Sequence, residues 1–136
     1  MRGRCVVPGK SEGEILVSSQ PISFWGGVDP ATGCINDSRH DLLGQSISGK
    51  VLVFPFGKGS STTSLIIVEL ARVDKAPAAM INLRTEPILA TGPIVCKHLY
   101  GKEIPIVTLD EGAFQMLKTG QHVIVNATEG EVVIKG

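Results

Sequence analysis

The arrangement of apolar and polar stretches along the chain predicts a mixed α/β domain. Residues 51–54 are β-branched or large and are followed by Pro55, which is typical of a buried strand that ends at a loop. Residues 62–72 show helical periodicity, and a short run of small and apolar residues at 78–81 predicts a buried strand of the parallel kind. The apolar face expected for the helix is formed by Leu65, Ile66, Val68 and Leu70. Strand, helix and strand would form a βαβ unit.

Further strands are predicted on both sides of this unit, over residues 3–7, 14–18, 106–109, 123–126 and 132–135. The first two, separated by a polar turn at 8–13, are expected to form a hairpin, and the last two are expected to form another. Residues 85–101 are interrupted by prolines and glycine and predict short helical pieces, with Pro93 in a first turn and Gly101 as the end. Asp110 is expected to cap a short helix that reaches Lys118.

The longest stretch without periodicity covers residues 20–49 and is rich in glycine, proline, asparagine and aspartate. A loop of this length in a compact domain is usually functional or disordered, and its apolar content argues against disorder. We expect it to pack beside the glycine- and serine-rich stretch at 57–64. Trp25 within it is interpreted either as a core anchor or as part of a surface for a partner.

Composition narrows the possible functions of the chain. The 136 residues predict a single domain over 1–136, and 13 basic residues balance 13 acidic ones without a basic, aromatic-interleaved patch for nucleic acid. The sequence shows neither a signal-peptide pattern nor an apolar run of about 18 residues, so we expect a cytoplasmic protein that does not bind membranes.

Cysteine and histidine give no sign of a metal site. The spacing of Cys5, Cys34 and Cys96 fits neither a disulfide framework nor a zinc or iron–sulfur site, so reduced, buried thiols and no metal ligands are expected. The three histidines are isolated in the sequence, and none has an evident partner. They are His40, His98 and His122.

The stretch 57–64 reads Gly-Lys-Gly-Ser-Ser-Thr-Thr-Ser and connects the predicted strand to the predicted helix. Glycines allow a close approach of the backbone, and the amides of a helix N-terminus favour an anionic group. The same residues could simply form a capped turn, and the lysine is misplaced for a Walker motif. Since a cap needs one hydroxyl and five follow in a row, a polar site is the alternative to a plain turn.

Residues 24–64 resemble the swivelling domain of the aconitase X group. The residues that carry this resemblance are Phe24 to Pro30, Thr32, Gly33, Ile35, Asp37, His40, Leu43, Gly44, Gly49 to Val53 and Gly57 to Ser64. The resemblance implies a swivelling β/β/α fold in which a mixed sheet is flanked by helices. It also implies a heterodimer, in which this domain closes over an aconitase-like large subunit that holds a 4Fe-4S cluster.

The resemblance also assigns roles within the turn. The wider aconitase superfamily carries Gly-Ser-Ser-Arg here, where the first serine removes a proton and the arginine grips a substrate carboxylate. The corresponding residues are Gly59, Ser60, Ser61 and Thr62. This implies Ser60 as the catalytic base, with Ser61 as the second catalytic residue, and Gly59, Thr62 and Thr63 as substrate-binding residues. Threonine in place of the arginine departs from enzymes that act on citrate-like or isopropylmalate-like substrates.

The reaction implied by the resemblance is the loss of water from 5-phosphomevalonate to give an anhydromevalonate phosphate, in the archaeal mevalonate route to isoprenoids. The iron of the partner would hold the leaving hydroxyl while Ser60 takes the proton. Two alternatives stay open: the same kind of subunit in a hydroxyproline dehydratase, and a non-catalytic swivelling domain that binds or carries a group. A serine hydrolase is disfavoured, since the Gly-x-Ser-x-Gly elbow is absent.

Overall fold

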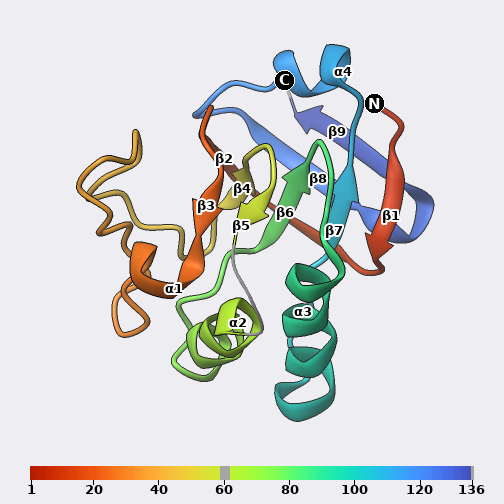
Figure 1. Cartoon of the computed structure of the whole chain (residues 1–136). Coiled ribbons are helices and arrows are strands. Elements are labelled where there is room, and N and C mark those ends of the chain that lie inside the picture. Colours follow the sequence, from red (N-terminus) through yellow and green to blue (C-terminus); the bar gives the residue numbers. More distant parts are fainter. Residues whose placement is uncertain (59–61, 136) are drawn as a thin grey trace.

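The computed structural model describes residues 1–58 and 62–135, and a seven-stranded sheet forms its centre (Figure 1). The strand order is β1-β7-β6-β4-β2-β8-β9. The four strands β2, β4, β6 and β7 run parallel, and β1, β8 and β9 are antiparallel to their neighbours. Their bounds are β1 Arg4–Val7, β2 Lys10–Val17, β4 Val51–Val53, β6 Ala79–Asn82, β7 Ile106–Thr108, β8 His122–Asn126 and β9 Glu131–Lys135.

The sheet curls until its two outer strands meet. A bridge joins Arg2 to Glu131, and the backbones of Met1 and Val132 exchange hydrogen bonds of 2.8 and 2.9 Å. The residues that precede β1 therefore pair with β9 and link the two edges of the sheet. Curling also encloses an inner core, which explains how a small domain buries both faces of its sheet.

Alternation along the strands separates two cores. In β4, Val51 and Val53 face the inner core, whereas Leu52 faces the outer one. Helices α2 (Thr62–Arg72) and α3 (Pro87–Tyr100) cover the outer face, as Figure 1 shows. The predicted mixed sheet with flanking helices is thus confirmed.

The predicted βαβ unit is formed by β4, α2 and β6, and α2 has the predicted bounds. Its predicted apolar face was partly wrong. The side chain of Leu65 is 66% exposed and Val68 is half-buried, while Ile67 is fully buried. The buried face is therefore rotated from the predicted one and also includes Thr63 and Ala71.

The predicted N-terminal hairpin was wrong. β1 pairs with β7, and β2 pairs with β4 and β8. β2 already begins at Lys10, where a polar turn was expected, because its first half pairs with β8 and exposes alternate polar side chains to solvent. The predicted C-terminal hairpin is confirmed: β8 and β9 pair around a short 3-10 turn, η1 (Ala127–Glu129), and Gly130, whose φ of 66° suits glycine.

Residues 87–100 form one helix instead of the short pieces that were predicted. Pro87 occupies its first turn, and Pro93 lies inside it. Pro93 cannot donate the usual backbone hydrogen bond within the helix. The helix nevertheless continues through it, because the face that carries Pro93 is buried against the outer core. Gly101 ends the helix in the left-handed region, as predicted. Asp110 caps α4 (Glu111–Gln115), which ends before the predicted Lys118.

The stretch 20–49 contains only two short elements, β3 (Ile22–Ser23) and α1 (Phe24–Gly27). β3 pairs in parallel with β5 (Gly57–Lys58), and Phe24 packs edge-to-face against Phe54 with ring centroids 6.0 Å apart. The loop therefore lies beside the residues that lead into the serine-rich stretch, as predicted.

Candidate functional site

The predicted site falls between β5 and α2. Gly59, Ser60 and Ser61, which include the predicted base, lie outside the described residues. Lys58 on one side and Thr62 on the other are described, and both belong to secondary structure. β5 is fixed by its pairing with β3, in which Ser23 lies opposite Lys58. The predicted catalytic residues are therefore connected to two well-defined elements.

Thr63 links these two elements directly. Its side chain is 2% exposed, and its hydroxyl donates a hydrogen bond of 3.2 Å to the carbonyl oxygen of Lys58. Because its proton is already donated, Thr63 could only accept a hydrogen bond from a substrate group. Thr62, at the first position of α2, is half-buried.

The first turn of α2 is also fixed to the first turn of α3. The Ser64 hydroxyl donates a hydrogen bond to the carbonyl oxygen of Ile88. The two helices lie very close together at Gly92, where an added Cβ would be 3.1 Å from the Cβ of Ile67 and 3.3 Å from the Cα of Ser64. The N-terminal ends of α2 and α3 therefore form one rigid unit beside β5.

Asn82 connects the carboxyl ends of two parallel strands. Its side chain is fully buried, donating to the carbonyl oxygen of Phe54 at 3.0 Å and accepting from the hydroxyl of Thr85 at 3.0 Å. The amides of Leu83 and Arg84 both donate to the carbonyl oxygen of Pro55. These bonds hold the loop after β6 against the segment that leads from β4 into β5. Ligands of α/β proteins commonly bind at this edge of the sheet.

Arg84 lies over the segment before β5. Its guanidinium carbon is 4.0 Å from the centroid of the Phe56 ring, a cation–π arrangement. Phe56 directly precedes Gly57, and Lys58 follows. Arg84 and Lys58 therefore place two cationic residues on the segment that leads toward the N-terminus of α2, which is positively polarised. Such a setting stabilises negative charge on a substrate or on a serine alkoxide.

A second group of side chains fixes the long loop. The ring of His40 lies 3.2 Å from the carbonyl oxygen of Pro21 and accepts from the Leu42 amide. Burial by itself would raise the pKa of Asp41, but hydrogen bonds from Ser18 and Ser19 hold that pKa below its ordinary value.

The expectation that the histidines have no partners was wrong for two of them. His40 joins this network, and His122 lies 3.1 Å from a carboxylate oxygen of Glu12. His40 also lines a cavity of about 300 Å³ with Lys58 and Arg39. The network therefore stabilises one wall of a space beside β5.

Residues 1–134 match the family model described as the aconitase X swivel domain. The chain belongs to this family. Its fold agrees with the crystal structure of Thermococcus kodakaraensis aconitase X in its holo-form, with a TM-score of 0.89 and 47% identity over 99% of this chain and 97% of that one.

Curated relatives match over nearly their whole length. The phosphomevalonate dehydratase small subunit of Methanosarcina mazei is 48% identical over 96% of this chain and 88% of its own. The protein of the same name from Thermococcus gammatolerans is 49% identical over 98% and 96%. A solution NMR structure of a UPF0107 protein matches with a TM-score of 0.88 and 39% identity, over 100% of this chain and 98% of the other.

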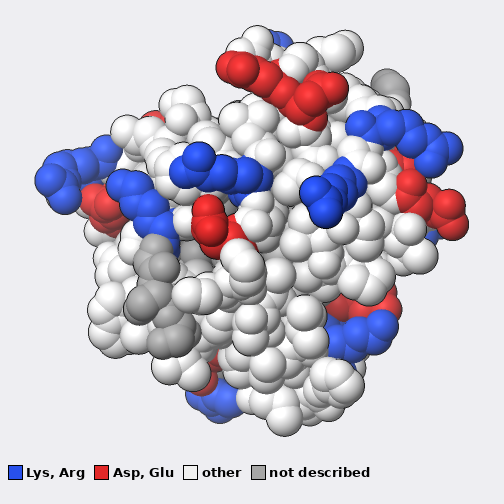
Figure 2. Space-filling model, turned by 45° about the vertical axis from the view of Figure 1, so that its right-hand side comes forward, with Lys and Arg blue, Asp and Glu red and all other residues white. Residues whose placement is uncertain are grey.

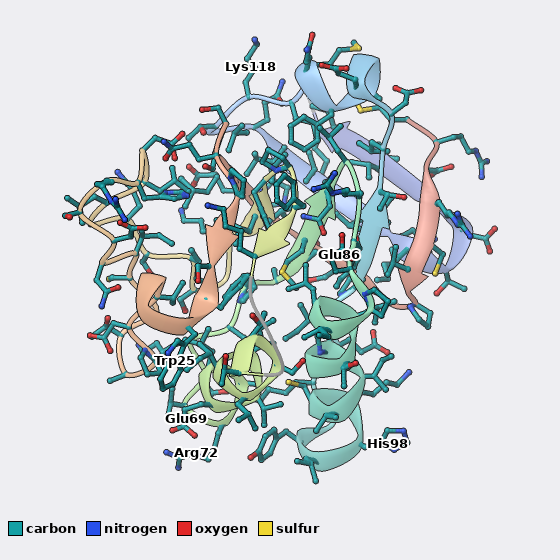
Figure 3. All side chains as sticks on the ribbon, in the orientation of Figure 1. Trp25, Glu69, Arg72, Glu86, His98 and Lys118 are labelled. Carbon is teal, nitrogen blue, oxygen red and sulfur yellow. The ribbon has the colours of Figure 1, made fainter. Side chains whose placement is uncertain are left out.

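Trp25 of this swivel domain is not a core anchor. Its side chain is 62% exposed, and Figure 3 shows it on α1 at the edge of the molecule, near the end of α2 that carries Glu69 and Arg72. Phe24 next to it is the buried residue. Of the two interpretations of Trp25, the surface one fits this exposure.

The described residues of the swivel domain contain no group of three or more histidine, cysteine or acidic side chains that could hold a metal ion. The cysteines are free: Cys5 is exposed, Cys34 is half-buried and Cys96 is buried, where burial raises the pKa of its thiol. The expectation of buried thiols was therefore wrong for Cys5, which lies on an outer strand. In the part of the chain that the structure describes, no helix is long and apolar enough to span a bilayer.

Sequence reasoning missed Asn82 and Arg84. The available signal was a change from apolar to polar residues directly after the predicted strand at 78–81. In a parallel sheet such residues lie at the same edge as the turn that follows β4. What the sequence could not supply was the contact of Arg84 with Phe56.

Proposed function

We propose that this chain is the small subunit of a hydro-lyase that removes water from 5-phosphomevalonate to give an anhydromevalonate phosphate, in a mevalonate route to isoprenoids. The observation that carries the proposal is the identity of 48% over 96% of the chain with a relative named phosphomevalonate dehydratase small subunit. The placement of the serine-rich stretch at the N-terminus of α2, at the carboxyl edge of the parallel strands, supports it.

In this proposal Ser60 is the base that removes a proton from the carbon next to the substrate carboxylate. The C–H and C–O bonds break, a carbon–carbon double bond forms, and the proton goes to the Ser60 oxygen while hydroxide leaves. A serine alkoxide is unstable at neutral pH unless its charge is stabilised. The helix N-terminus and the ammonium group of Lys58 are the groups of this chain suited to that task.

Gly59, Ser61, Thr62 and Thr63 are proposed to orient the substrate. Thr63 would act mainly by holding the start of α2 on β5, because its proton is donated to Lys58. Ser61 and Thr62 would hydrogen-bond substrate oxygens. In the wider superfamily the position of Thr62 is an arginine, so another residue of the complex would have to supply a guanidinium or ammonium group.

We propose that the 4Fe-4S cluster belongs to an aconitase-like large subunit and not to this chain. The described residues do not fit a cluster, because their cysteines are not gathered with other ligands. The name "small subunit" of the relatives itself implies a larger partner. Closure of the two subunits would exclude water from Ser60.

The relatives' names do not favour the alternatives weighed from the sequence. A hydroxyproline dehydratase would act on a substrate without phosphate, whereas the named substrate carries one. A carrier domain would need a reactive histidine. His40 lines the cavity beside Lys58, but its side chain is 6% exposed and its ring nitrogens already contact Pro21 and Leu42.

The test is anaerobic co-purification with the large subunit encoded by the same organism, followed by assays with 5-phosphomevalonate and with 3-hydroxyproline. We expect dehydration of the first substrate only, with this chain alone inactive and free of iron–sulfur absorbance. Turnover of hydroxyproline alone, or a cluster bound by Cys5, Cys34 and Cys96 of this chain, would contradict the proposal.

A further inference from the structure

A cavity of about 420 Å³ opens at the carboxyl edge of the parallel strands, between the loop after β6 and the outer strand β1. It is lined by Arg4, Cys5, Val6, Leu83, Arg84, Thr85 and Thr108. In the sheet Thr108 of β7 lies directly opposite Arg4 of β1 on one side and Asn82 of β6 on the other. The cavity is thus built mostly on paired strands, whose geometry is rigid.

The lining of this cavity carries two arginines and no carboxylate. Arg84 has one acidic neighbour, Glu86, at 3.8 Å, and both side chains are more than half exposed, so this ion pair is weak. Among the described residues Arg4 has no ion-pair partner. Figure 2 shows separate lysine and arginine side chains across the upper half of the view, with acidic side chains beside several of them and a larger acidic group above.

Like charges that share one cavity repel each other, and a bound anion removes this cost. A guanidinium presents its N–H donors in a planar fork that matches the oxygens of phosphate. Arg84 is held in place by its stacking on Phe56 and by the bonds of its loop to Pro55. It is therefore preorganised for an anion, which lowers the entropic cost of binding.

Two threonine hydroxyls line the cavity, and one of them is already used in a hydrogen bond within the chain. Thr85 donates its proton to Asn82, which fixes the loop but leaves no proton for an anion. The hydroxyl of Thr108 makes no hydrogen bond within the described parts of the chain, 1–58 and 62–135. Thr108 can therefore donate a hydrogen bond to a bound anion, next to Arg4, which lies opposite it on β1.

The cavity adjoins the segment that leads toward the predicted base. The Phe56 ring on which Arg84 stacks belongs to the segment that continues through Lys58 to Ser60. An elongated substrate with a phosphate at one end and the reacting carbon at the other could extend along this segment.

We propose that Arg84 and Arg4 bind the phosphate group of the substrate and make the enzyme specific for phosphorylated hydroxy acids. This inference rests on the proposed function. It accounts for the absence of an arginine at Thr62: the cationic contacts of the small subunit lie instead on the loop after β6 and on β1. A substrate without phosphate would leave both arginines unpaired.

The first experiment uses the assembled enzyme with Arg84→Gln and Arg4→Gln in this subunit. Arg2→Gln is the matched control, because Arg2 lies outside the cavity and pairs with Glu131. We expect KM for 5-phosphomevalonate to rise roughly 10- to 100-fold in each cavity variant, as for the loss of a charge-assisted hydrogen bond, with Arg84→Lys retaining part of the affinity. Inorganic phosphate should inhibit the wild type competitively and inhibit the cavity variants less.

KM values equal to that of Arg2→Gln would overturn the inference and leave the proposed function intact. A loss of association with the large subunit, at unchanged KM for the complex that still forms, would also overturn it, since the cavity would then receive a side chain of the partner.

The second experiment does not depend on activity. The full chain alone is titrated with inorganic phosphate and followed by amide NMR shifts. We expect saturable shifts at residues 83–85 and 108 that are lost in the Arg84→Gln variant and kept in Arg2→Gln. Shifts that are absent, or unaffected by Arg84→Gln, would overturn the inference. If the wild-type complex does not dehydrate 5-phosphomevalonate, the proposed function fails, and this titration still decides whether the cavity binds phosphate.

Discussion

At the scale of single residues, the site is stabilised by polar side chains whose hydrogen bonds join its segments. Asn82 joins the ends of β4 and β6, Thr63 joins α2 to β5, and Asp41 joins the long loop to the end of β2. The bonds of Asn82 and Asp41 connect residues 28 and 23 positions apart in the sequence. A buried polar group without its partner costs about 1–3 kcal/mol, so these residues define one arrangement of the site more strictly than apolar packing would.

The carboxylate of Asp41 makes the stability of the long loop depend on pH. Its folded-state pKa is lowered by the hydrogen bonds from Ser18 and Ser19 that outweigh the effect of burial. A lowered folded pKa contributes stability that is present above the unfolded value of 3.8 and is lost as the pH falls through the folded value. We therefore expect Asp41→Asn to lose less stability than the wild type between pH 6 and acid pH, in urea unfolding. An equally steep loss in both proteins would show that the hydrogen bonds do not affect ionisation.

At the scale of elements, helices α2 and α3 pack closely against each other. Their close approach depends on Gly92, which leaves no room for a side chain against Ile67. The bond from Ser64 to Ile88 then aligns the two N-terminal ends.

Gly92→Ala is expected to destabilise the fold although alanine favours helices. The added methyl would push α2 away from α3 at a cost of about 1–3 kcal/mol, which exceeds the roughly 1 kcal/mol gained in helix propensity. Gly112→Ala in α4 is the control, since its nearest neighbour is the Asp110 carboxylate at an ordinary 3.6 Å, and it should be neutral or stabilising. Thermal unfolding compares the two. A melting temperature of Gly92→Ala at or above the wild-type value would contradict this account of the helix pair.

The elements also show what the sequence could and could not predict. The βαβ unit and α2 were predicted correctly because their apolar periodicity is local and uninterrupted. The first half of β2 was missed because it alternates lysine, serine and glutamate and is recognisable only through its pairing with β8. The residues of α3 were predicted to form short pieces because they contain Pro93. The packing that keeps them in one helix comes from another element, which the local sequence does not reveal.

For the site, the sequence supplied the serine-rich stretch and the loop beside it. The contacts of His40 with Ser18 and Pro21 and of Arg84 with Phe56 join segments about twenty or more residues apart, so local patterns carry no trace of them.

At the scale of the whole molecule, the candidate site residues gather at one edge of the curled sheet, where the parallel strands end. The segment from β4 into β5, the loop after β6 and the end of β7 lie at the carboxyl ends of the parallel strands, and the long loop adds the exposed Trp25. A subunit that completes its active site with a partner must expose both its catalytic residue and a docking surface around it. The exposed Trp25 is suited to such docking, because buried tryptophans often dominate interface energy.

Trp25→Ala should therefore weaken association with the large subunit by about 10-fold or more while the isolated chain loses less than about 1 kcal/mol of stability. Met116→Ala, which changes an equally exposed apolar side chain at the end of α4, is the control and should change neither. Association is measured by titration of one labelled subunit with the other. A large drop in the melting temperature of Trp25→Ala, with normal association, would return Trp25 to a packing role.

The central claim is that this chain supplies the base of the dehydration, and the most direct measurement is the turnover of the complex with Ser60→Ala and Ser61→Ala. Replacement of a base should lower kcat by about 100-fold or more while folding, assembly and substrate binding persist. Ser61→Ala should act mainly on KM. If Ser60 merely caps α2, its replacement would cost about 1 kcal/mol of stability and leave turnover nearly intact. Near-normal turnover with Ser60→Ala, or a collapse confined to Ser61→Ala, would contradict the assignment of Ser60 as the base.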